Sequence, residues 1–355
     1  MTGTMRRGFA ATAAALLALA LAACGSPTAA PTPETTTVTV DATVDPDKGA
    51  APTPDVPVTW PLTGIAGEIV DRPALVVKVE NTAQARPQTG LDQADVVWET
   101  IVEFDVSRLV AVFQSQVPAE VGPIRSVRPM DMPIAAPLKG LFAFSGGQTG
   151  ILALANDSGM QLLSHDAGTD GFYRIKKRSA PHNVYGNPST FWGLAKEGRV
   201  APAPQFVFAR TPAQASAVVA GTPAQTLTYR LSSAAKPAWT WDGGAGRWLR
   251  FEGSKPATVV TGDQISATNV VTIVAEHPRT RFHAQNNAPV PTYNLIGSGE
   301  GWIATGGKTI PVNWSKHGDD QPMVLTLADG TPATLAPGNT WVELVPKGTG
   351  SLTIG

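Results

Sequence analysis

The stretch ALVVKV at residues 74–79 is an almost unbroken apolar run that follows Arg72-Pro73. It shows little of the alternation between apolar and polar residues that marks a strand with one face in water. We therefore predict a strand buried on both faces. A strand of this kind is typical of an α/β or α+β domain with a mixed sheet, which is the fold class we expect here.

Further strands and helices are predicted on the C-terminal side of this run. Residues 95–103 and 107–113 are expected to form two strands joined by a two-residue turn at Asp105-Val106. That turn places Phe104 opposite Ser107 and Glu103 opposite Arg108. Another strand is expected at 141–144, a loop and short helix at 123–138, and helices at 151–155 and 191–195.

The pattern becomes β-rich from Thr226 onward. Trp239, Trp241 and Trp248 flank a glycine-rich segment, which predicts a β-hairpin. Short strands are expected at 269–275, 301–304, 323–327 and 340–345, and residues 297–301 are expected to form a hairpin loop. We therefore predict an N-terminal domain at 59–205 and a smaller β-rich domain at 206–355.

Cys24 follows Leu21-Ala22-Ala23 and a short apolar run, the pattern of a cysteine that is lipidated before the leader is removed. The run is too short to span a bilayer, which needs roughly 20 residues. We expect a signal peptide at 1–23 and a lipid on Cys24 that anchors the chain to the outer face of the cytoplasmic membrane. Arg6-Arg7 fits either the twin-arginine or the general secretory route, so both export routes stay open.

Residues 24–58 are rich in Pro, Thr, Ala and Asp and contain few large apolar side chains. Such a segment cannot bury enough surface to fold, and its prolines favour extended geometry. We expect a disordered linker that holds the folded part away from the membrane.

Composition excludes several classes of function. The chain has 27 Lys and Arg against 28 Asp and Glu, so its bulk charge predicts no nucleic-acid partner. The single cysteine, once lipidated, leaves no thiol for a disulfide, a nucleophile or a metal ligand. His277 and His283 lack a completing carboxylate, so we expect no metal and no cofactor.

Several motifs in order resemble the YerB-type lipoprotein family, the DUF3048 domain. They are RPQTGL (86–91), ADVVWE (94–99), Arg108-Leu109, FQS (113–115), GPIRSVR (122–128), SGG (145–147) and APHN (180–183). NVV (269–271) and TWVELVP (340–346) resemble that family's C-terminal domain. The resemblance implies a two-domain extracytoplasmic lipoprotein and brings no established activity with it.

The first domain concentrates the polar residues that suggest a site. Arg125 and Arg128, three residues apart, are expected to share a helix face and to bind an anion together with the turn Ser145-Gly146-Gly147. The full set of predicted ligand-binding residues is Asn81, Arg86, Arg108, Arg125, Arg128, Ser145, Gly146 and Gly147. In the structural alternative, Glu103 and Arg108 form a cross-strand ion pair, and Arg125 and Arg128 tie loops together by bonding backbone carbonyls.

Two residues are candidates for proton transfer, Glu99 and His182. His182 follows a basic run at 174–178, which is either a solvated loop or a contact for anionic wall polymer or lipid headgroups. We favour a non-catalytic envelope module for an anionic wall or membrane ligand or a protein partner. A hydrolase or transferase acting on a wall glycan or phosphate-bearing polymer is the alternative.

Overall fold

The apolar run at 74–79 forms β1 (Leu75–Glu80), whose six residues are all buried. Its neighbours are β3 (Ser107–Phe113), which is antiparallel, and β4 (Leu141–Phe144), which is parallel. The structure, a computed structural model, describes residues 57–284 and 287–355. The predicted signal peptide, Cys24 and nearly all of the predicted linker lie outside these residues. No helix in the described part combines the length and apolar character needed to cross a membrane.

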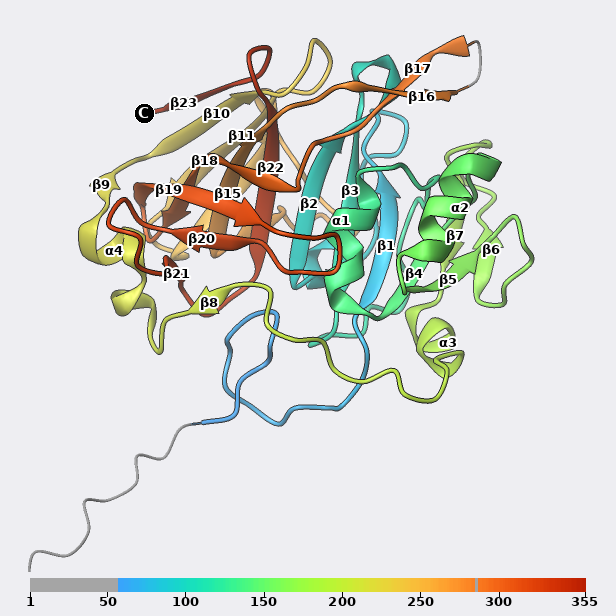
Figure 1. Cartoon of the computed structure of the whole chain (residues 1–355), viewed down its shortest axis with the longest axis horizontal. Helices are drawn as coiled ribbons and strands as arrows, with labels where there is room; N and C mark the ends of the chain where they lie inside the picture. Colours follow the sequence, from blue (N-terminus) through green and yellow to red (C-terminus); the bar gives the residue numbers. More distant parts are fainter. Residues whose placement is uncertain (1–56, 285–286) are drawn as a thin grey trace, which may run out of the picture. The chain divides into compact units, whose positions relative to one another are not determined.

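β1 belongs to a mixed sheet of eleven strands with the order β20-β19-β18-β15-β22-β2-β3-β1-β4-β5 (Figure 1). The remaining strands of this sheet are β2 (Val96–Ile101), β5 (Gln161–Ser164), β9 (Thr222–Pro223), β15 (Asn269–Ala275), β18 (Gly297–Thr305), β19 (Lys308–Lys316), β20 (Val324–Thr326) and β22 (Thr340–Pro346). The strand β9 pairs with β19 beside the main order. Strands from both halves of the chain therefore share one sheet.

The two halves meet where β2 and β22 pair in parallel, in a register that aligns Val96 with Thr340 and Glu99 with Glu343. Both strands are buried along their whole length. Parallel strands of this kind need cover on both faces. A second sheet covers one of these faces, where Trp239 packs on Trp341 and donates to Glu343 of β22.

The second sheet has six strands and contains the tryptophan hairpin predicted from the sequence. Its strands are β10 (Thr226–Arg230), β11 (Pro237–Asp242), β12 (Arg247–Glu252), β13 (Lys255–Pro256), β14 (Ser266–Ala267) and β23 (Ser351–Ile354). Trp241 lies opposite Trp248 across the hairpin, and Trp239 and Trp248 are fully buried. The hydroxyl groups of Tyr229 in β10 and Thr272 in β15 lie 2.7 Å apart and link the two sheets.

Short helices and strand pairs complete the described part (Figure 1). The helices are α1 (Asp131–Ala135), α2 (Thr149–Asp157), α3 (Pro188–Gly193) and α4 (Ser216–Ala220), with single 3₁₀ turns η1 (Leu91–Gln93), η2 (Glu103–Asp105), η3 (Ala136–Leu138) and η4 (Pro212–Gln214). The strand pairs are β6 (Phe172–Arg174) with β7 (Val184–Gly186), β8 (Val207–Phe208) with β21 (Thr334–Leu335), and β16 (Arg279–His283) with β17 (Pro289–Pro291). Helix α3 packs against β1 and β4.

The guanidinium of Arg250 crosses from the second sheet to the β2–β22 pair. It donates to Glu99 of β2 at 2.7 Å, to Glu343 of β22 at 2.9 Å and to Glu252 of its own strand at 2.8 Å. Glu99 and Glu343 are fully buried, and the Arg250 side chain is 1 % exposed. One cation thus holds the two sheets together at the strand pairing that unites both halves of the chain.

Two local predictions were wrong. The strands β2 and β3 align Thr100 with Arg108, and the connection is longer than two residues because η2 occupies it. Phe104 and Asp105 both have positive φ there, at 63° and 59°. Residues 297–301 are paired strand in β18, whose glycines let its partner strands approach closely, and do not form a loop.

Replacing Arg250 by leucine is expected to destabilise the fold by about 3–5 kcal/mol, because buried carboxylates lose their cation. Urea unfolding monitored by tryptophan fluorescence measures this. Arg230→Leu is the matched control, since Arg230 is exposed and its one side-chain bond is to the Thr349 carbonyl. Equal midpoints for Arg250→Leu and the wild type would contradict the role given to this residue.

Candidate functional site

The His182 side chain contacts a buried carboxylate at the end of β1. Its Nδ1 lies 2.8 Å from Oε1 of Glu80, the last residue of the strand, and Glu80 is 1 % exposed. A carboxylate only accepts hydrogen bonds, so Nδ1 is the donor in this contact, and Nε2 forms no hydrogen bond with a described residue. Thr82 also donates to Glu80 at 2.8 Å, and Nε of Arg125 lies 3.6 Å from its other oxygen.

A hollow of about 970 Å³ opens beside His182. Its wall includes the basic run Lys176-Lys177-Arg178 and one carboxylate, Glu120. The remaining lining residues are Gln84, Thr89, Ile175, Ser179, Tyr185 and Val260. Arg178 is fixed by donating to the carbonyls of Pro87, at 2.7 Å, and Gln84. Three cations against one anion make this a basic hollow, the name used for it below.

The predicted arginine pair is arranged differently from the expectation. Arg125 and Arg128 precede α1 in non-helical chain, so the prediction that they share a helix face was wrong. Arg125 contacts Glu80 and the Pro181 carbonyl beside the basic hollow. Arg128 is buried and donates to Glu103, with Nε 2.7 Å from Oε2.

Arg108 joins the same Glu103 at 3.3 Å, so the predicted ion pair is present although the two residues are not cross-strand partners. Its other guanidinium nitrogen donates to the Ser126 carbonyl at 2.9 Å. Burial lowers the pKa of both Arg108 and Arg128 to about 10, which leaves them charged at neutral pH. The guanidiniums of both arginines therefore already bind groups of the protein, namely Glu103 and backbone carbonyls.

The turn Ser145-Gly146-Gly147 lies between β4 and α2, as predicted. The Ser145 amide donates to the Arg125 carbonyl at 3.0 Å, and the Gly146 carbonyl accepts from Val127 at 3.0 Å. The turn is therefore fastened to the segment that carries Arg125 and does not line the basic hollow.

Asn81 and Glu99 belong to the buried network around Arg250. The Asn81 amide donates to Glu99 at 3.2 Å and to Glu252 at 3.1 Å. Arg86, which is partly exposed, pairs with Glu252 at 2.8 Å. The predicted residues thus fall into three neighbouring networks, and His182 and Arg125 are the two that lie at or beside the basic hollow.

The buried network has one carboxyl group more than it has guanidiniums, and the shifted pKa of Glu343 singles out this residue. The network contains Glu99, Glu252 and Glu343 but only the guanidiniums of Arg250 and Arg86. Burial, followed by the adjacent charge of Glu99, raises the pKa of Glu343 well above its ordinary value. A protonated Glu343 leaves the carboxylates and guanidiniums balanced.

Glu80, Lys78 and Arg250 were missed as site residues by the sequence analysis. Lys78 is a charged residue in the strand predicted to be buried, and Glu80 directly follows that predicted strand, which was a usable signal. Lys78 pairs with buried Asp131 at 2.6 Å, and burial lowers its pKa to about 8. Arg250 lies two residues from buried Trp248 and so faces the same side of β12. Among the described residues, no group of His, Cys, Asp and Glu could hold a metal ion.

Comparison with known proteins identifies the class. The family model described as "Protein of unknown function (DUF3048) N-terminal domain" matches residues 62–201, and its C-terminal counterpart matches 226–342. The chain belongs to this family of YerB-type proteins.

One relative is YerB of Bacillus subtilis strain 168, which its name classes as a lipoprotein. It is 25 % identical over 309 residues, which cover 84 % of this chain and 89 % of YerB. The crystal structure of B. subtilis YerB superposes with a TM-score of 0.68 at 24 % identity, over 83 % of this chain and 99 % of that one. The fold is therefore that of YerB, with a large mixed sheet and a strand-rich C-terminal part.

The raised pKa of Glu343 predicts a pH effect on stability. A group whose pKa is higher in the folded state stabilises fully below its unfolded pKa, about 4.3 for glutamate, and loses that contribution as pH rises. Glu343→Gln mimics the protonated form and should remove this loss, so its free energy of unfolding falls less than that of the wild type between about pH 4 and pH 8.

Urea unfolding across this range measures the difference. Glu300→Gln, at an exposed position, should keep the pH dependence of the wild type. A slope for Glu343→Gln identical to that of the wild type would show that Glu343 does not hold the extra proton.

Proposed function

We propose that the chain is a non-catalytic envelope lipoprotein that binds an anionic wall or membrane ligand in the basic hollow. The observation that carries the proposal is the basic run 176–178 lining a hollow beside a histidine held by a buried carboxylate. In this proposal the lipid on Cys24 holds the protein to the outer face of the membrane.

The charges of the hollow support an anion as the occupant. Lys176 and Lys177 form no ion pair with any described residue. Arg178 is held in place by backbone carbonyls, so its position is set before a ligand arrives. Glu120, the opposing charge, already accepts the Tyr173 hydroxyl at 2.5 Å. Donors of one sign, one of them held in place, favour carboxylate or phosphate.

The other predicted residues have a supporting role in this proposal. Arg108, Arg128 and the turn at 145–147 hold the segment 125–128 against the sheet. Asn81 and Arg86 connect β1 to the buried network. Arg125 keeps Glu80, and through it His182, in place.

Binding of inorganic pyrophosphate tests the proposal. The full chain with Cys24→Ser, which cannot be lipidated, is titrated by isothermal calorimetry. Lys176→Gln/Lys177→Gln should weaken affinity about fivefold, the effect of two partly exposed charge contacts, and added salt should weaken the wild type further.

The matched control is Lys236→Gln/Lys255→Gln, which removes two exposed lysines outside the hollow. It should bind pyrophosphate as the wild type does. Equal losses in both double variants, or no binding by the wild type, would overturn the small-anion proposal. Crosslinking to a protein partner would then be the next measurement.

The geometry of His182 and Glu80 favours one second candidate, a hydrolase for phosphate esters. Nε2 would take a proton from water as the water oxygen forms a bond to phosphorus. The phosphorus–oxygen bond to the alcohol would then break, and the departing oxygen would take the proton from the imidazolium. General acid–base catalysis of this kind typically contributes 10²–10⁴-fold. Glu99, the other proton-transfer candidate, is fully buried and lines none of the hollows described here.

Turnover of bis(p-nitrophenyl) phosphate separates the two functions. We expect none above the buffer rate, because the chain is proposed to bind without catalysis. A measurable rate that is lost in His182→Ala and Glu80→Gln but kept in His317→Ala would instead establish the hydrolase. His317 is exposed and lies outside the basic hollow, which makes it a suitable control.

A further inference from the structure

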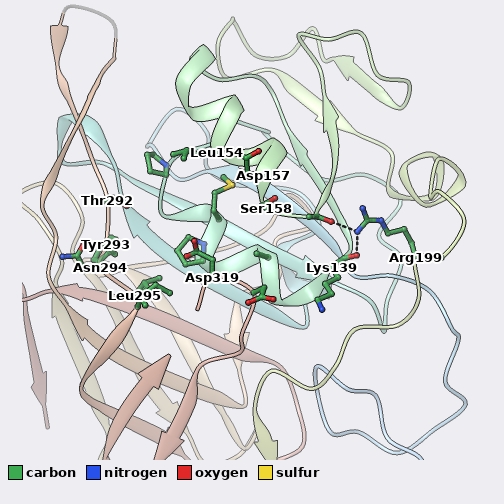
Figure 2. A pocket seen from close by; sticks show the side chains of 18 of the residues that line it. Lys139, Leu154, Asp157, Ser158, Arg199, Thr292, Tyr293, Asn294, Leu295 and Asp319 are labelled. Atoms are coloured by element: carbon green, nitrogen blue, oxygen red, sulfur yellow. Dashed lines mark hydrogen bonds between the residues drawn. The ribbon is translucent and has the colours of Figure 1, made fainter. Parts of the chain in front are cut away.

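A second hollow, of about 1080 Å³, lies between residues of both family regions (Figure 2). Residues of α1 and α2 form one side, and the segment 292–296 with the loop at 319–320 forms the other. None of its lining residues is shared with the basic hollow. The two hollows are therefore separate sites.

Several apolar side chains line this hollow. Met132 and Leu295 are buried at its base, while Leu154 and Ile296 remain 38 % and 47 % exposed. Pro129, Pro133 and Ala136 extend the same surface along α1. Exposed leucine and isoleucine in a concave site favour a ligand with an apolar body.

Carboxylates surround this apolar surface. Asp157, Glu197, Asp319 and Asp320 all line the hollow, and none forms an ion pair with another described residue. In Figure 2, Asp157 lies at the end of α2 and Asp319 lies on the loop at 319–320. The Lys316 ammonium donates to the Asp319 carbonyl at 3.0 Å, and its charge offsets part of the charge of Asp319 and Asp320. An apolar surface lined by more carboxylates than cations favours a cation that carries a hydrocarbon part.

The two cations of the hollow do not reverse this charge. Arg199 donates to the carbonyls of Lys139, at 2.5 Å, and Gly159, at 2.8 Å, as the dashed lines in Figure 2 show. These bonds fix the guanidinium at one end of the hollow and leave its positive charge in place. Lys139 is the second lining cation, so four carboxylates of the lining face two cations.

We propose that this hollow binds a small cationic amphiphile, a molecule with one apolar chain and an ammonium head. The apolar chain of this ligand packs on Leu154, Ile296 and the α1 face. The ammonium group lies among the carboxylates, which include Asp319 and Asp320 on the loop between β19 and β20. This site is separate from the anion site of the proposed function, so each can be tested alone.

Three probes with the same tail test the proposal: decyltrimethylammonium, decanoate and decyl maltoside, each below its micellar concentration. The full chain with Cys24→Ser is titrated by calorimetry. Decyltrimethylammonium should bind tightest. Asp319→Asn/Asp320→Asn should weaken it about fivefold, as expected for two partly exposed charge contacts, and leave decyl maltoside unchanged.

Leu154→Gln should weaken decyltrimethylammonium and decyl maltoside alike, because it removes apolar contact. The matched controls are Asp92→Asn/Asp170→Asn for charge and Val219→Gln for an exposed helical apolar residue, all outside the hollow. Unchanged thermal unfolding confirms that each variant folds. Decanoate binding as tightly as the cation, or equal losses in the control and test variants, would overturn the proposal, as would the absence of any binding.

Discussion

The structure depends on burying one guanidinium among carboxylates. Arg250 meets Glu99 and Glu343 where β2 and β22 pair, so the strand register that joins the two halves of the chain also sets the charge contacts. Carboxylates buried side by side are tolerated only if a cation or a proton compensates them. Here Arg250 supplies the cation, and burial beside Glu99 raises the pKa of Glu343, which favours its protonated form. The packing of the second sheet excludes the water that would otherwise solvate these groups.

This buried network also reaches the basic hollow. Asn81 donates to Glu99, and Gln88 donates both to Asn81, at 2.8 Å, and to the Glu80 carbonyl, at 3.0 Å. Glu80 in turn holds His182. Hydrogen bonds on either side of Glu80 therefore connect the interface between the sheets to the partly buried histidine. The contact with Glu80 orients the imidazole before a ligand arrives, which reduces the ordering that binding would require.

Sequence periodicity predicted the elements whose burial is continuous and local. The bounds of β3, β4 and β15 agree with the expected 107–113, 141–144 and 269–275. It could not predict the pairing of β2 with β22, because strands so distant along the chain are joined by tertiary packing alone. The β2–β3 connection was misread because Phe104 and Asp105 adopt positive φ, which their side chains disfavour. The partners of the candidate site were missed for a related reason: Glu80 meets His182 only through the fold.

The net charge of the chain predicts no nucleic-acid partner, but it does not reveal local charged sites. The 27 basic and 28 acidic residues nearly cancel, yet the structure separates them into a hollow with a surplus of lysine and arginine and another with a surplus of carboxylates. Screening limits the reach of each surface charge to about 8 Å at physiological ionic strength. A ligand entering either hollow therefore experiences the local charge and not the neutral average. A nearly neutral protein can in this way present one site for an anion and another for a cation.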